Sequence, residues 1–111
     1  MELRTVPYES NGLTMLGEIA VPQGPGPFPG VLVMPDARGL GKLAKDAAKR
    51  LAALGYVALA TDPYGGAYFG VGKQVMEFHK DPSLLRSRSL PAYEILKAQP
   101  NVDPNRIAAI G

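Results

Sequence analysis

Apolar residues in this chain follow two different spacings, which predict strands and helices in alternation. Residues 31–34, 56–60 and 106–110 are apolar at nearly every position, as expected for strands that are buried on both faces. Between these runs, residues 42–54 and 81–99 place their apolar side chains at helical spacing. The pattern predicts an α/β fold in which the three strands are parallel neighbours, joined by right-handed crossovers.

The first 21 residues have the pattern of a β-hairpin. Two strand-like runs, residues 5–9 and 13–21, flank Ser10, Asn11 and Gly12. Asn-Gly favours a tight turn, because both residues tolerate a positive φ. Residues 22–29 are rich in proline and glycine and predict a connecting loop. We therefore expect residues 1–111 to form one unit, an antiparallel hairpin that leads into a parallel sheet with flanking helices.

The first helix is expected to begin near Lys42 and to end at Gly55, a left-handed cap. Its apolar positions are Leu43, Ala47, Leu51 and Leu54, with Ala44 and Ala48 beside them.

The second helix is expected to start after Asp81 as N-cap, with Pro82 at its first position. Pro91 is expected to kink or split it. Residues 67–80 predict a loop with one or two helical turns, and residues 101–105 predict a turn before the last strand.

Composition and charge exclude several classes of protein. Hydrophobic residues make up 46% of the 111 residues, which is enough to build a core. Twelve Lys and Arg against ten Asp and Glu give a net charge of +2, and the basic residues are scattered, so we expect no nucleic-acid partner. No apolar run is long enough to cross a membrane, and the opening residues lack a signal-peptide pattern, so we expect a soluble, cytoplasmic protein.

The inventory of reactive side chains is short. The sequence contains no cysteine, which excludes disulfides and cysteine-based metal sites. Its single histidine, His79, has no ligand partner spaced near it, and we expect it on the surface. No serine lies in a Gly-x-Ser-x-Gly setting, so a complete Ser-His-Asp site cannot be assembled from these residues.

Three blocks of the sequence resemble the dienelactone hydrolases, a family of α/β-hydrolases. Residues 28–40 resemble the third strand of that family and its following loop, and residues 51–62 resemble the next helix and strand. Residues 98–111 resemble the run into the nucleophile. The resemblance covers nearly the whole chain as the N-terminal half of such a domain. It implies hydrolysis of a small-molecule ester or lactone by a cysteine or serine nucleophile, without a cofactor.

The resemblance also implies roles for residues at the ends of the strands. Gly111 would open the family's Gly-x-Cys-x-Gly elbow, so the nucleophile, the acid and the histidine would lie beyond it. Asp36 matches a glutamate that interacts with the resting thiol but is one methylene shorter, and Pro35 replaces a residue that is often histidine. The backbone N–H of Ala37 would be one donor of the oxyanion hole. The family also holds a substrate carboxylate with arginines, for which Arg86 and Arg88 are candidates.

Other polar residues allow both a functional and a structural interpretation. Arg38, with Lys42 and Lys45, could attract an anionic substrate, or could be solvated surface charge. Tyr64 could border the substrate cleft or pack as a core aromatic. Asp62 is expected to hydrogen-bond the turn in which it lies.

Two other classes of function stay open. Residues 39–44 fit Gly-x-Gly-x-x-Ala at the start of a helix, which is the outline of an NAD(P)-binding Rossmann fingerprint in an oxidoreductase. Residues 35–38, however, separate the strand from the first glycine, and an N-terminal hairpin is foreign to that fold. The third class is a non-catalytic module that packs against a partner. In the hydrolase interpretation, residues 106–110 would form a central strand of the whole domain, and in this chain they would be an exposed edge that is open to self-association.

Overall fold

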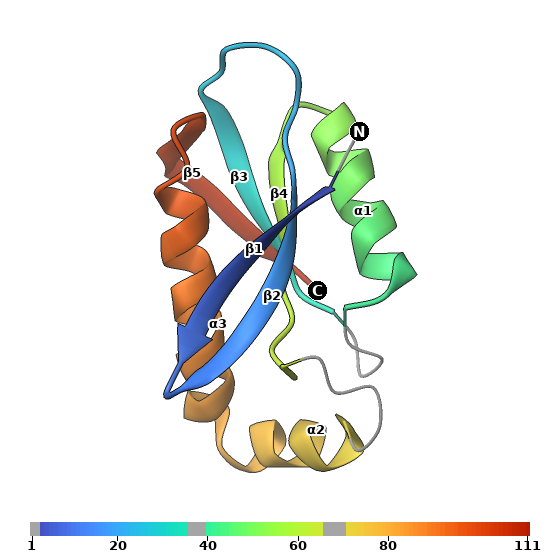
Figure 1. Ribbon diagram of the computed structural model, residues 1–111, viewed down its shortest axis with the longest axis vertical. Helices are drawn as coiled ribbons and strands as arrows, with labels where there is room; N and C mark the ends of the chain where they lie inside the picture. Colours follow the sequence, from blue (N-terminus) through green and yellow to red (C-terminus); the bar gives the residue numbers. More distant parts are fainter. Residues whose placement is uncertain (1–2, 36–39, 66–70) are drawn as a thin grey trace.

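The computed structural model describes residues 3–35, 40–65 and 71–111. They form one mixed sheet of five strands in the order β1-β2-β4-β3-β5, with helices on both faces (Figure 1). The strands are β1 (Leu3–Ser10), β2 (Leu13–Ala20), β3 (Phe28–Val33), β4 (Val57–Ala60) and β5 (Val102–Ile110). The helices are α1 (Lys42–Ala53), α2 (Val71–Lys80) and α3 (Pro82–Lys97).

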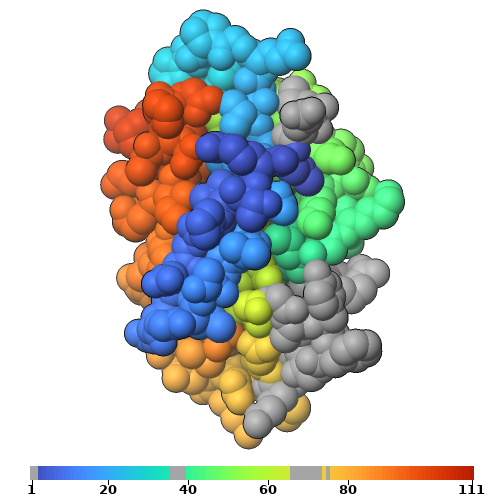
Figure 2. Space-filling model, viewed as in Figure 1, coloured from blue at the N-terminus to red at the C-terminus, as the bar shows by residue number. Residues whose placement is uncertain are grey.

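The predicted parallel arrangement of the three buried strands is confirmed. β3 lies between β4 and β5 and pairs in parallel with both. The N-terminal hairpin joins the sheet through β2, which pairs antiparallel with β1 and with β4. In the space-filling view the hairpin runs across the visible face between α3 and α1 (Figure 2). The expected α/β class, an antiparallel pair leading into a parallel sheet, is therefore correct.

The alternation of side chains along β3 and β4 produces two cores, one on each face of the sheet. On one face Leu32 and Leu59 pack with Ala92 and Leu96 of α3. On the other face, buried residues of α1 pack with residues of the strands in a second cluster. Its members are Ala20, Val31, Val33, Ala44, Ala48, Ala52, Ala58 and Ala60.

Both predicted glycine turns have the expected backbone. Asn11 and Gly12 have φ values of 50° and 81°, and they connect β1 to β2 as a two-residue hairpin turn. Gly55 has φ 99° and follows the end of α1, as a left-handed cap should.

The buried face of α1 differs from the expected one. Its fully buried residues are the alanines Ala44, Ala48 and Ala52, whereas Leu43 and Leu54 are 60% and 74% exposed. The strands below this helix also present alanines, so small side chains on both surfaces let the helix approach the sheet closely. The large leucines then lie beside the contact and not within it.

Residues 71–80 were expected to be mostly loop, but they form the ten-residue helix α2. The next helix begins as predicted, since Asp81 accepts a hydrogen bond from the backbone N–H of Ser83 at 3.2 Å and Pro82 occupies the first turn.

Pro91 does not split α3, which continues through it to Lys97. Proline lacks the N–H that would bond to the carbonyl of Ser87, one turn earlier. That carbonyl accepts a hydrogen bond from the Ser10 hydroxyl at 2.7 Å instead. The end of the hairpin therefore replaces the helix bond that proline removes.

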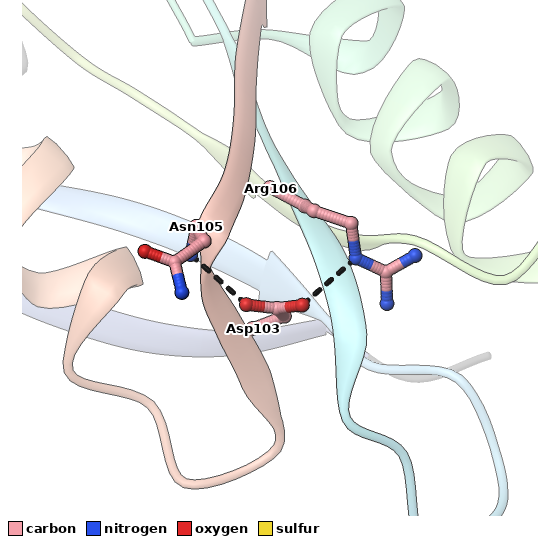
Figure 3. Close-up of polar contacts among 3 residues, drawn as sticks. All are labelled: Asp103, Asn105 and Arg106. Carbon is pink, nitrogen blue, oxygen red and sulfur yellow. Dashed lines mark hydrogen bonds and ion pairs between the residues drawn. The ribbon is translucent and has the colours of Figure 1, made fainter.

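The last strand is longer than predicted and contains the expected turn as an irregularity. Val102 lies opposite Phe28, yet Ile107 lies opposite Gly30, so β5 carries extra residues between these two pairs. In that interval the Asp103 carboxylate accepts hydrogen bonds from the backbone N–H of Asn105 and from Nε of Arg106, both at 2.9 Å (Figure 3). The carboxylate supports a local turn without ending the strand.

Gly30 of β3 lies against side chains of both α3 and β5. A Cβ built there would lie 3.2 Å from two carbons of Leu96 and 3.3 Å from Val102, and both of those side chains are buried. We predict that Gly30→Val lowers the free energy of unfolding by about 1 to 3 kcal/mol, the usual cost of overpacking a core. Ala108→Val, which adds a β-branched side chain at an exposed strand position, should change it little. Urea denaturation of both variants measures the difference, and equal midpoints would contradict the prediction.

Candidate active site at the carboxyl edge of the sheet

The carboxyl ends of β3 and β5 meet at one edge of the sheet. The backbone N–H of Met34 donates to the carbonyl of Ile110 at 2.8 Å, directly after both strands end. A Cβ built on Gly111 would lie only 2.9 Å from Cβ of Met34, so glycine permits this approach. The predicted partners of Gly111, namely Asp36 and Ala37, lie outside the described residues, as does Arg38. Their meeting with Gly111 stays a prediction, although the chain leading to them is adjacent to it.

A pocket of about 430 Å³ opens beside this junction. Its walls come from the end of β3, the first two turns of α1 and the end of β5, and they are predominantly apolar. Lys42 contributes the charged group among them. The lining residues are Val33, Met34, Pro35, Gly41, Lys42, Leu43, Ala44, Ala47, Ile110 and Gly111.

The segment after β4 is held by a buried turn around Asp62. One carboxylate oxygen of Asp62 accepts from the backbone N–H of Tyr64 at 3.3 Å, as the sequence predicted. The backbone N–H of Asp62 donates to the hydroxyl of Tyr8, on the edge strand β1, at 2.9 Å. Both Asp62 and Tyr64 are buried. The hairpin thus fixes the loop that follows β4.

Tyr8 is a buried titratable group in this network, and burial raises its pKa from 10.0 to about 12. The folded protein keeps the phenol proton at a pH where the unfolded chain has lost it. This contribution to stability is complete below pH 10 and is lost between pH 10 and 12, by about 1.4 kcal/mol per pH unit.

The pH dependence can be isolated with Tyr8→Phe. Near pH 8 the variant should be less stable by about 1 kcal/mol, because it lacks the hydroxyl that accepts the Asp62 N–H. As the pH rises from 10 to 12, the stability difference between the two proteins should shrink and then reverse. Urea denaturation of both proteins across this pH range measures the difference in free energy of unfolding. A difference that stays constant with pH would contradict the raised pKa of Tyr8.

The predicted substrate-binding residues after β4 have unequal surroundings. Tyr64 packs against Phe78 of α2, with ring centroids 5.8 Å apart. Nη1 of Arg88 donates to the carbonyl of Pro63 at 2.7 Å and to Oε1 of Gln74 at 2.6 Å. Arg86, two residues earlier on α3, is exposed. The structure therefore brings Arg88 and Tyr64 into one cluster but leaves Arg86 outside it.

Sequence reasoning missed Gln74 and Phe78, because it assigned their segment to a loop. The spacing of Val71, Val75 and Phe78, at positions i, i+4 and i+7, is typical of an amphipathic helix and could have revealed it. His79, as expected, is exposed. In the part of the chain that the structure describes, no group of three or more His, Cys, Asp or Glu side chains could hold a metal ion. None of the described helices is long and apolar enough to span a membrane.

Comparison with solved structures places this arrangement among known proteins. The protein called m3DLH is 37% identical and superposes with a TM-score of 0.90 over 99% of this chain and 48% of its own. A dienelactone hydrolase-like promiscuous phosphotriesterase from metagenomic libraries is 35% identical, with a TM-score of 0.85 over 99% of this chain and 48% of its own. A dienelactone hydrolase from Anabaena variabilis, 17% identical with a TM-score of 0.71, covers 97% of this chain and 50% of its own, and shares the fold.

This chain spans about half the length of these structures. A search of the curated proteins finds no significant match. The likeness supports a hydrolase-type fold and leaves the dinucleotide-binding alternative without support. Residues 15–111 match the profile of the Dienelactone hydrolase family, and the chain belongs to that family.

Proposed function

We propose that this chain is the N-terminal half of a hydrolase that cleaves small-molecule esters or lactones without a cofactor. The observation that carries the proposal is the junction of Gly111 with the end of β3. This contact between Met34 and residues 110–111 supports the proposal that Gly111 opens an elbow and that the chain after β3 carries the oxyanion donor. A sharp turn after β5 would then raise a cysteine or serine, two residues beyond Gly111, above the carboxyl edge of the sheet.

In the proposed reaction, that nucleophile attacks the carbonyl carbon of the substrate, and the carbonyl oxygen acquires negative charge. The Ala37 N–H would stabilise this oxygen as one of two donors. The alcohol then leaves, taking a proton, and water releases the acid from the acyl-enzyme. Asp36 would interact with the resting nucleophile, Arg38 would attract an anionic substrate group, and Tyr64 would border the cleft.

A chimera tests this proposal. The chain would replace the corresponding half of the phosphotriesterase, which is 35% identical to it. We expect a folded protein that hydrolyses p-nitrophenyl acetate, with turnover abolished when alanine replaces the nucleophile of the other half. Asp36→Asn should retain the fold and lower turnover. A folded chimera without nucleophile-dependent turnover would instead favour a non-catalytic packing module.

A further inference from the structure

Arg88, on α3, contacts both α2 and the segment that follows β4. Its Nη1 atom donates to the carbonyl of Pro63, in the segment after β4, at 2.7 Å. The same atom donates to Oε1 of Gln74 on α2 at 2.6 Å. Its guanidinium carbon also lies 5.2 Å from the ring centroid of Phe78, in a cation–π contact with α2. One charged group, the guanidinium of Arg88, therefore joins α3 to α2 and to the segment that follows β4.

A second set of contacts links the same segments to one another. The side-chain nitrogen of Gln74 donates to the carbonyl of Tyr64 at 3.3 Å, while its oxygen accepts from Arg88. The rings of Tyr64 and Phe78 pack with their centroids 5.8 Å apart. Hydrogen bonds to both the nitrogen and the oxygen of its amide therefore orient Gln74. Together with Arg88, Tyr64 and Phe78 it forms one connected cluster of side chains.

The helix α2 depends on this cluster for its position. It has ten residues, fewer than an isolated helix needs to be stable in water. Phe78 is the buried side chain among its described residues, and it packs between Tyr64 and Arg88. In Figure 1 α2 lies below the sheet, beyond the end of β4 and beside the start of α3.

We propose that Arg88 is a positioning residue, whose guanidinium fixes α2 and the turn at Pro63 and Tyr64 against α3. Any consequence for a substrate through Tyr64 rests on the proposed function; the positioning itself does not. This role differs from that of a ligand for a substrate carboxylate, because Nη1 of the guanidinium donates to Pro63 and Gln74 and its carbon lies over the ring of Phe78.

Hydrogen exchange of the 111-residue chain tests the proposal without any turnover. In Arg88→Gln, the amides of residues 71–80 should lose protection by about tenfold or more, because a hydrogen bond to a charged group is that strong. The amides of β3 and β4 should keep theirs. Arg86→Gln removes the same charge from an exposed position on the same helix, and should leave α2 unchanged. Unprotected α2 amides in the parent chain, or equal losses in the two variants, would overturn the proposal.

Two further variants keep the test decisive if Arg88→Gln destabilises the whole chain. If Arg88→Gln also loses protection throughout the sheet, Gln74→Ala decides, since it removes the same hydrogen bond from α2. If Gln74→Ala loses amide protection only in residues 71–80, the proposal is supported. If this variant loses no protection there, the proposal is overturned. Arg88→Lys keeps the charge and one donor, so α2 should recover part of its protection.

Benzoate serves as a probe for the competing carboxylate-binding role. At millimolar concentration it should leave the protection of α2 unchanged in the parent chain. A benzoate-dependent increase that is absent in Arg88→Gln would show that the guanidinium is available to an anion, and would overturn the positioning role. These experiments use no hydrolase activity, so their failure is distinguishable from failure of the proposed function.

Discussion

The 111-residue chain alone is expected to hydrolyse neither aryl esters nor lactones above the background rate. It contains no cysteine, no serine in an elbow setting, and one histidine that is exposed on α2. In serine proteases an oxyanion hole and substrate binding still give roughly a thousandfold over water without the triad. This chain would supply at most one donor of such a hole, through Ala37, and should therefore give far less.

The assay compares the purified chain with the same chain after heat denaturation, using p-nitrophenyl acetate and a simple aryl lactone. Equal rates are the expected result. A protein that includes the elbow and the remainder of the domain should raise the rate by several orders of magnitude, since nucleophile and base then act together. Turnover by the 111-residue chain that scales with its concentration and survives repurification would contradict the account.

Self-association through β5 is the second large effect that we expect. Among the described residues no strand pairs with the outer edge of β5. The carbonyl of Ile110 bonds back toward β3, so the N–H and C=O groups of Ile107 and Ala109 face away from the sheet. Ala108, Ala109 and Ile110 are exposed, and no charged side chain lies among them. Asp103 and Arg106, earlier on the strand, pair with each other, so residues 107–110 lack the charges that normally prevent strand pairing between molecules.

The test introduces the same charge at two exposed alanines. Ala109→Lys places a lysine on the open edge, whereas Ala53→Lys places it at the end of α1. Light scattering at about 100 μM should find dimers or larger species for the parent chain and for Ala53→Lys, but monomers for Ala109→Lys. A monomeric parent chain, or equal dissociation by the two variants, would show that β5 is not the associating surface.

Local sequence signals predicted most of the fold, because several residues in this chain strongly favour the backbone conformation that they adopt. Asn11 and Gly12 specify the hairpin turn, and Gly55 specifies the end of α1 through its positive φ. The buried runs were recognisable as strands since they are apolar at nearly every position, which is typical of a parallel sheet covered on both faces.

The errors arose where a contact distant in sequence overrides a local preference. Pro91 would break an isolated helix, but the Ser10 hydroxyl supplies a partner for the carbonyl that proline leaves unbonded. The helix α2 is held by Arg88, fourteen residues beyond Gln74. The buried face of α1 depends on the alanines of the strands beneath it, which its own periodicity does not reveal.

The candidate site was predictable only as far as strand order determines it. Parallel strands bring their carboxyl ends to one edge, so the adjacency of Gly111 and the end of β3 follows from the pattern of buried strands. The cluster around Arg88 does not follow from strand order. It joins a loop and two helices through contacts among a guanidinium, an amide and two aromatic rings.

The most direct test of the central claim is the coding sequence that follows the codon for Gly111. If this chain is the N-terminal half of a dienelactone hydrolase-type enzyme, a cysteine or serine should stand two residues after Gly111 and a glycine two residues after that, with an acid and a histidine further on. A stop codon directly after Gly111, or a continuation that lacks this nucleophile, would contradict the account.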